Sequence, residues 1–432
     1  MKASTTALAL LLVACSKPPA GALPASSVIE PGPLPSSSAQ ATRAAASKRP
    51  LNVVLLTIDS LRADMPWSGY ARDIAPRLGG LERRSVSYTH AYAISSFTSK
   101  SVGGLLGGDY PSAMTRDGVF FTRYFPNNVM FPELLQGAGV RTMAGHAHMY
   151  LDRGRGFDQG FDDYRLVDGI TFDYNKDPYV TSQKLTPLAI DMLGKGASKT
   201  PFFAWFHFMD PHDSYLPHAE GPAFGKRARD LYDGEVHYTD QWIGKLLDYI
   251  DAAPWGKDTA IIVTADHGEA FGEHGLYRHA HELWEELVHV PLFIALPGIP
   301  PKRIDAYRSA IDLAPTILEL TGVAHQAPFR GESLVAEMMG RAAPAPRPVI
   351  CDLPEDTFND RRRAIIDGGY KLIAFGNDVR YELYDLSADP REQDNLFRKQ
   401  PDRAKAMVAR YRELSAAIPK GDVKGGVVRK KD

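Results

Sequence analysis

The sequence predicts an α/β protein with a mostly parallel β-sheet sandwiched by helices, followed by a small C-terminal antiparallel sheet plus a helix. The first observation is a set of continuous apolar runs rich in β-branched residues, which are typical of strands buried on both faces. These runs lie at 51–58, 201–209, 259–265 and 290–296. The second observation is helical spacing of apolar residues between them, as at 231–250 and 309–320. In such sheets ligands bind beyond the carboxyl ends of the strands, so the site is expected there.

The pattern changes after Gly331, where short strands are joined by turn residues. We expect strands at 348–353, 363–367, 370–375 and 381–386, and then a helix at 401–416. The chain therefore divides into a larger domain over 51–330 and a C-terminal antiparallel subdomain over 331–420. The basic tail, 421–432, is expected to be frayed.

Composition excludes several classes of protein. The chain has 432 residues, of which 44% are hydrophobic, with 50 Lys+Arg against 52 Asp+Glu. This balance is typical of a soluble globular protein and excludes a wholly disordered chain and a polytopic membrane protein. A formal charge of -2 provides no field to attract nucleic-acid phosphates, so we expect no nucleic acid partner.

The N-terminus predicts export. The apolar stretch 7–13 is too short for a hydrocarbon core of about 30 Å, which indicates a signal peptide over 1–15. Leu-Val-Ala-Cys15 resembles the bacterial lipoprotein box, in which the cysteine is lipidated; an ordinary signal peptide with an incidental cysteine is the alternative. Residues 16–50 are rich in Pro, Ala and Ser and predict a disordered tether. No Asp follows Cys15, so the expected location is the cell envelope, lipid-anchored at the outer membrane and facing the periplasm.

Acidic residues follow two of the buried strands. Asp59 comes directly after the first run, and Asp266 and His267 follow the third. A single Asp after a strand is usually a cap or turn residue, but two such positions beside a histidine supply two oxygens and one imidazole for a divalent cation. A hydroxyl-rich segment before a helix expected to begin near Thr98 offers a further oxygen, where the helix N-terminus favours an anion.

Histidines gather at the same expected edge of the sheet. Any one of them is more often structural than catalytic, yet clustering past strand ends indicates a site. They are His146 and His148, His207 and His212, and His274, His279 and His281.

Six ordered stretches between residues 51 and 416 resemble the sulfatase family of the alkaline phosphatase superfamily. They are 52–64, 154–164, 210–215, 264–269 with 272–275, 284–291, and 381–390 with Asn395-Leu396. The resemblance implies that Asp59 is the first metal acid, that Asp266-His267 is the second metal motif, and that the loop 210–215 contacts substrate.

The sequence departs from that family at the nucleophile. Family sulfatases carry Cys-x-Pro-x-Arg or Ser-x-Pro-x-Arg, whose first residue is oxidised to formylglycine. Leu105-Leu106 resembles the helix that follows this motif, and counting back from it places Thr98 at the nucleophile position. Ser96 takes that position only if the helix is shifted by two residues. Neither register has the Pro and Arg or a cysteine. We therefore expect no formylglycine and an unmodified Thr98.

One divalent cation, Ca²⁺, Mg²⁺, Mn²⁺ or Zn²⁺, is expected as the cofactor. Its predicted ligands are Asp59, Thr98, Asp266 and His267. Such a cation would lower the pKa of the Thr98 hydroxyl and polarise the ester.

Further catalytic residues are predicted beside the cation. Lys100 and the helix N-terminus are expected to compensate charge on the non-bridging oxygens. The resemblance implies that His212, with His279 or His281, contacts the ester or protonates the leaving oxygen.

The predicted activity is hydrolysis of sulfate or phosphate esters of a small molecule, glycan or lipid through Thr98. One alternative is a transferase that moves a phospho-substituent onto an envelope glycolipid or glycan. The other is a homologue that binds anions without catalysis, suggested by Lys100 and Val102 at positions where the resemblance implies basic residues.

Overall fold

The computed structural model describes residues 49–170, 180–197, 201–219 and 221–428. The predicted signal peptide, Cys15 and nearly all of the predicted tether lie outside the described residues, as do 429–432 of the basic tail. Across the described ranges, no helix combines the length and the apolar character that crossing a membrane requires.

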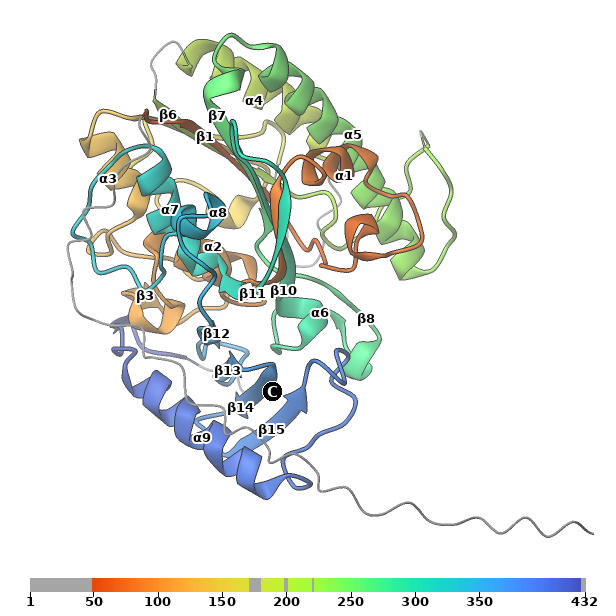
Figure 1. Cartoon of the computed structure of the whole chain (residues 1–432), viewed down its shortest axis with the longest axis vertical. Coiled ribbons are helices and arrows are strands. Elements are labelled where there is room, and N and C mark those ends of the chain that lie inside the picture. Colours follow the sequence, from red (N-terminus) through yellow and green to blue (C-terminus); the bar gives the residue numbers. More distant parts are fainter. Residues whose placement is uncertain (1–48, 171–179, 198–200, 220, 429–432) are drawn as a thin grey trace, which may run out of the picture. The chain divides into compact units, whose positions relative to one another are not determined.

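An eight-stranded sheet forms the centre of the larger domain (Figure 1). Its spatial order is β11-β2-β10-β7-β1-β6-β4-β5. The strands are β1 (Asn52–Ile58), β2 (Val86–Tyr92), β4 (Arg141–His146), β5 (Asp163–Leu166), β6 (Phe202–Phe208), β7 (Thr259–Ala265), β10 (His289–Ala295) and β11 (Lys302–Ser309). All neighbours are parallel except those of β10, which runs antiparallel to both β2 and β7. The predicted mostly parallel sheet is therefore confirmed, with the 290–296 run as its one reversed strand.

Strand β1 shows why the sheet is covered on both sides. Every residue of β1 is buried. Successive side chains of a strand point to opposite faces. Val53 and Leu55 accordingly enter one hydrophobic cluster, while Val54 and Leu56 enter another. Each cluster is closed by its own layer of helices.

The two helical layers enclose the sheet (Figure 1). On the face of Val54 lie α1 (Pro76–Glu82), α4 (Ser182–Gly196) and α5 (Ala228–Ala252). On the face of Val53 lie α2 (Thr98–Gly107), α3 (Phe131–Gly137), α7 (Leu313–Leu320) and α8 (Val335–Met338). The helix predicted at 309–320 begins later than expected, because Ser309 ends β11 and 310–312 form a 3-10 turn.

The C-terminal subdomain is the predicted antiparallel sheet with one helix. It comprises β12 (Val349–Leu353), β13 (Arg362–Asp367), β14 (Tyr370–Phe375), β15 (Arg380–Asp385) and α9 (Pro401–Ala416). The sheet is a meander in sequence order, with each strand antiparallel to the next. A backbone hydrogen bond of 2.7 Å from Asp352 to Ile94 connects β12 to the segment preceding α2.

The start of the basic tail is ordered, contrary to the expectation of fraying. Val423–Lys424 (β16) pair in parallel with Arg116–Asp117 (β3). Gly421 also donates a backbone hydrogen bond of 2.8 Å to Ser112. Backbone pairing with the larger domain therefore holds this stretch, which the charged composition alone did not indicate.

Candidate active site

The predicted acids meet at the carboxyl edge of the sheet. Strands β1 and β7 are parallel neighbours, with Ile58 opposite Ala265. Asp59 and Asp266 are the next residues of the two strands, so the sheet register alone places them side by side. Both are buried.

Thr98 lies between these strand ends. It is the first residue of α2, after Phe97, and its side chain is fully buried. Its Oγ1 lies 3.1 Å from His267 Nε2 and 3.4 Å from Asp59 Oδ2. The helix N-terminus and the two strand ends thus bring all four predicted metal ligands together.

His267 presents an unprotonated nitrogen to this group. Its Nδ1 lies 2.9 Å from the carbonyl oxygen of Gly268, which can only accept, so Nδ1 carries the hydrogen. Nε2 therefore offers its lone pair to the site, 3.5 Å from Asp59 Oδ1 and 3.5 Å from Asp266 Oδ2. Burial lowers the pKa of His267, which keeps the ring in this neutral, ligating form.

The two carboxylates differ in their proton affinity. Burial raises the pKa of Asp59, but His212, His207 and His267 outweigh burial and hold its pKa well below the usual range. Burial raises the pKa of Asp266, and the charge of Asp59 raises it further. Two adjacent carboxylates cannot both ionise without a compensating positive charge.

These residues fit a divalent cation. Among the described residues, neither oxygen of the buried Asp266 carboxylate has a hydrogen-bond partner. Asp59, Asp266 and His267 also present atoms within 4.8 Å of one another. Two hard oxygens, one imidazole and the adjacent Thr98 hydroxyl suit Ca²⁺, Mg²⁺, Mn²⁺ or Zn²⁺ alike.

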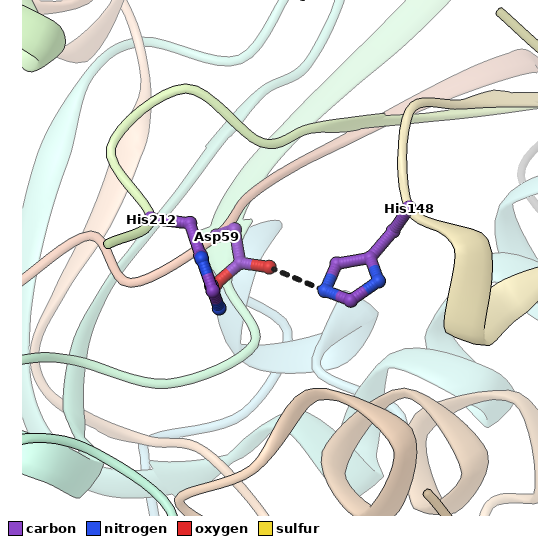
Figure 2. Close-up of side chains that lie close together, drawn as sticks. All are labelled: Asp59, His148 and His212. Carbon is purple, nitrogen blue, oxygen red and sulfur yellow. Dashed lines mark ion pairs between the residues drawn. The ribbon is translucent and has the colours of Figure 1, made fainter. Parts of the chain in front are cut away.

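Further histidines surround Asp59 on its other side. Figure 2 shows His148 and His212 beside Asp59, and His148 Nε2 lies 3.6 Å from Asp59 Oδ2. His207 Nε2 lies 3.4 Å from the same oxygen. His148 Nδ1 accepts the Tyr150 backbone N–H at 3.3 Å, so the ring hydrogen sits on Nε2 and points toward Asp59.

The sequence placed His148 and His207 among the clustered histidines but gave neither a specific role. His207 lies in β6 beside β1, paired with Thr57, and His148 follows β4 on the far side of β6. The order of strands in the sheet was the missing information. Buried imidazole N–H groups at this edge are suited to bind an anion.

The structure separates His279 from His281. The His279 ring lies 4.2 Å from the His267 ring and 4.9 Å from the His212 ring. Its Nδ1 is 3.1 Å from Glu269 Oε1. His281 Nδ1 instead lies 2.6 Å from Asn359 Oδ1, in the C-terminal subdomain. Of the two candidates, His279 is therefore the one packed against the cluster around Thr98.

Lys100 is engaged differently from the expectation. Its ammonium is fully buried and lies 2.5 Å from Asp356 Oδ2, with a second contact of 3.3 Å to the carbonyl oxygen of Phe120. The charge of Lys100 is thus neutralised by the loop between β12 and β13. This pair attaches α2 to the C-terminal subdomain, and the charge-compensating role expected for Lys100 has no support in these contacts.

Ser96, the alternative nucleophile, is less well placed. Its hydroxyl is buried and has no hydrogen-bond partner within the part of the chain that the structure describes. Its carbonyl accepts the Ala280 N–H at 2.8 Å, which anchors the loop that carries His279. The hydroxyl facing the acids and His267 is that of Thr98.

Comparison with known proteins finds sulfatases. Residues 51–323 match the sulfatase family, and 272–416 match the C-terminal region described as N-sulphoglucosamine sulphohydrolase, C-terminal. An ulvan-active sulfatase of Formosa agariphila is 26% identical over 81% of this chain and 77% of its own. A choline-sulfatase of Rhizobium meliloti is 24% identical over 85% of this chain and 86% of its own.

A solved structure shares the fold. The crystal structure of a putative sulfatase from Bacteroides thetaiotaomicron superposes with a TM-score of 0.72 at 19% identity, over 85% of this chain and 92% of that one. Well over half of the 432 residues fall within the matched family region. The chain therefore belongs to the sulfatase family.

Proposed function

We propose that this sulfatase-family ester hydrolase cleaves sulfate esters with unmodified Thr98 as its nucleophile and one divalent cation held by Asp59, Thr98, Asp266 and His267. The observation that carries the proposal is the position of Thr98 Oγ1, 3.1 Å from His267 Nε2 and 3.4 Å from Asp59 Oδ2. A hydroxyl at this point meets the two strand-end acids and the N-terminus of α2 at once.

Thr98 would attack the ester directly. The hydroxyl donates toward Asp59 Oδ2 at 3.4 Å, and that carboxylate is the acceptor for its proton as the oxygen attacks. A bond from Thr98 Oγ1 to sulfur forms while the bond from sulfur to the alcohol oxygen breaks. Water then attacks the sulfur, releases sulfate and restores the Thr98 hydroxyl.

Other side chains would bind the sulfate group and the leaving alcohol. The Nε2–H of His148 and the free N–H groups at the start of α2 are donors for the non-bridging oxygens. Burial lowers the pKa of His279 to about 3, and an anionic ester bound beside the ring would raise it, so His279 is the proposed donor for the leaving oxygen. A divalent cation, when bound, lowers the pKa of the attacking hydroxyl and polarises the ester.

The substrate class follows from the relatives. One acts on ulvan and another is named for choline sulfate, so their sulfated groups include a glycan and a small alcohol. We propose the same range for this chain, a sulfated glycan or small molecule. We further propose that lipidation of Cys15 holds the enzyme at the outer membrane, in the periplasm.

The test is turnover by the purified chain of an aryl sulfate, a choline or sugar sulfate, a phosphate monoester and a phosphodiester. The expected result is release of sulfate that stops with a chelator and returns when Mg²⁺, Ca²⁺, Mn²⁺ or Zn²⁺ is added back. Thr98→Ala should abolish turnover, whereas Ser96→Ala should retain it.

The same experiment covers the other activities. Product formed only when an acceptor alcohol is added would replace hydrolysis by transfer. Saturable binding of metal and sulfate with no turnover of any probe would show a binding protein and overturn the proposal.

A further inference from the structure

We propose that Glu269 is a positioning residue that fixes the orientation and the tautomer of His279, so that the His279 Nε2 faces the leaving oxygen of the ester. This inference rests on the proposed function and extends it to a residue that the sequence did not indicate. Glu269 lies two positions after His267, the last predicted metal ligand. Its carboxylate contacts His279 and Tyr215.

The Glu269 carboxylate is held on both of its oxygens. Oε1 lies 3.1 Å from His279 Nδ1, and Oε2 accepts the Tyr215 hydroxyl at 2.8 Å. The side chain is fully buried. Its backbone is held as well, because the Arg62 guanidinium donates to the Glu269 carbonyl at 2.6 Å. A carboxylate held on every side defines one position for the imidazole that contacts it.

The segment around His279 is held in a strained conformation. Arg278 and Ala280, the residues on either side, have φ values of 71° and 83°, which residues other than glycine rarely adopt. The Ala280 N–H donates to Ser96 at 2.8 Å, and the Ala280 carbonyl accepts the Asn359 amide at 3.1 Å. Such strain persists only where surrounding contacts enforce it, and it clusters at functional positions.

The hydrogen bond to Glu269 decides which nitrogen of His279 faces the reaction. A neutral imidazole carries one hydrogen, and donation of Nδ1–H to the carboxylate leaves Nε2 as the atom that takes up and releases a proton. The His279 ring is 4.2 Å from that of His267, whose own Nε2 contacts Thr98.

The other candidate histidines have uncharged partners at Nδ1. His212 Nδ1 lies 2.5 Å from the Asp213 carbonyl oxygen, and His281 Nδ1 contacts the Asn359 amide oxygen. Among these three histidines, His279 is therefore the one whose Nδ1 faces a buried carboxylate.

Glu269→Gln tests the proposal in the metal-loaded full-length protein. Rates are measured on aryl sulfates whose leaving phenols span a range of pKa. We expect kcat to fall about 10²-fold for the most basic phenol and only a few-fold for the most acidic, with little change in KM. The double variant Glu269→Gln/His279→Gln should have a kcat only slightly below that of Glu269→Gln, because both changes impair the same proton donor.

Glu235→Gln is the matched control. Glu235 is another buried glutamate, and it bonds to a histidine, His218, at 2.6 Å. Glu235 lies in α5 and His218 in the segment that precedes this helix. Its replacement should leave the dependence on the leaving group unchanged. Tyr215→Phe, which loosens Glu269 without removing it, should show a smaller effect in the same direction. Equal loss of kcat for all leaving groups in Glu269→Gln would overturn the proposal.

A second readout does not require activity. Nitrogen-15 NMR of labelled histidines, with the His279 signal identified by its loss in His279→Gln, reports the tautomer. We expect Nδ1–H in the wild type and Nε2–H in Glu269→Gln, where the amide donates to Nδ1. An unchanged tautomer overturns the inference, whereas a changed tautomer in a chain that turns over no sulfate ester leaves it standing and removes only the proposed function.

Discussion

Thr98 Oγ1 lies 3.1 Å from His267 Nε2, although 169 positions separate the two residues along the chain. The parallel pairing of β1 with β7 places Asp59 and Asp266 at one sheet edge, and α2 begins at the same edge with Thr98. The candidate nucleophile therefore meets the acids at a point that two strand ends and one helix N-terminus define together.

Replacement of Thr98 tests whether this residue is the nucleophile or only a metal ligand. Thr98→Ala should lower kcat by at least about 10³-fold while the chain still binds metal through Asp59, Asp266 and His267. Thr98→Ser, which keeps the hydroxyl, should retain most of the activity. Mass spectrometry of rapidly quenched wild type should find a sulfate group on the peptide that contains Thr98. A sulfated peptide in Thr98→Ala would instead assign the nucleophile to Ser96 or another hydroxyl.

Asp266→Asn should have opposite effects on stability and on function. Without metal, the folded chain holds the Asp266 and Asp59 carboxylates side by side, and both burial and Asp59 raise the pKa of Asp266. Removal of one charge should raise the free energy of unfolding of the metal-free chain by about 1 kcal/mol. Metal affinity should fall at least about tenfold, which is what loss of even a supporting partner of a ligand costs.

Thermal unfolding with and without metal, together with metal titration, checks both effects. Asp248→Asn, an exposed change on α5, serves as the control for the substitution itself. A lower melting temperature of metal-free Asp266→Asn would contradict the proposed repulsion.

The predicted site residues that the structure brings together include those that follow buried strands. Asp59, Asp266 and His267 each come after a continuous apolar run, and strand ends converge in any parallel sheet. The sequence did not predict strands β2 and β11, because they contain more polar residues and only part of each is buried. Specific roles for His148 and Glu269 could not be predicted, because these roles depend on which side chains lie opposite them, and strand order and loop conformation determine that.

Lys100 and Asp356 should matter for stability more than for substrate binding. Both side chains are fully buried and bonded to each other. Lys100→Met alone leaves the Asp356 charge without its cation and should lower the free energy of unfolding by about 3–5 kcal/mol. Combining Lys100→Met with Asp356→Asn should recover most of that loss. Denaturant unfolding of the two single variants and the double variant measures the coupling. A stable double variant whose KM for sulfate ester rises about tenfold or more would restore the charge-compensating role predicted for Lys100.

Cys15 should determine where the protein is found in the cell. If Cys15 is lipidated, the full-length chain should sediment with outer membranes and dissolve only in detergent. Cys15→Ser should release it as a soluble periplasmic protein or leave its precursor uncleaved. Cys351→Ser is the matched control, because Cys351 is buried in β12 of the folded body. Wild-type protein found wholly in the soluble periplasmic fraction would contradict the anchor.

The buried carboxylate of Asp240 should make stability depend on pH. Its oxygens accept the backbone N–H groups of Arg77 and Leu78 at 2.9 and 2.7 Å, at the start of α1. Burial nevertheless raises the pKa of Asp240 from 3.8 to about 7. Between these two values the folded chain holds a proton that the unfolded chain has lost, so the free energy of unfolding falls as pH rises and levels off above pH 7.

Asp240→Asn isolates that contribution, because an amide does not titrate in this range and its oxygen still accepts one of the two N–H groups. Between pH 5 and pH 8 the wild type should lose stability relative to Asp240→Asn by up to about 3 kcal/mol. Melting temperatures of the two proteins across this range measure the difference, and Asp248→Asn on the same helix should follow the wild type. A gap between wild type and Asp240→Asn that stays constant with pH would mean that Asp240 is already ionised in the folded chain, its charge offset by the two helix N–H groups.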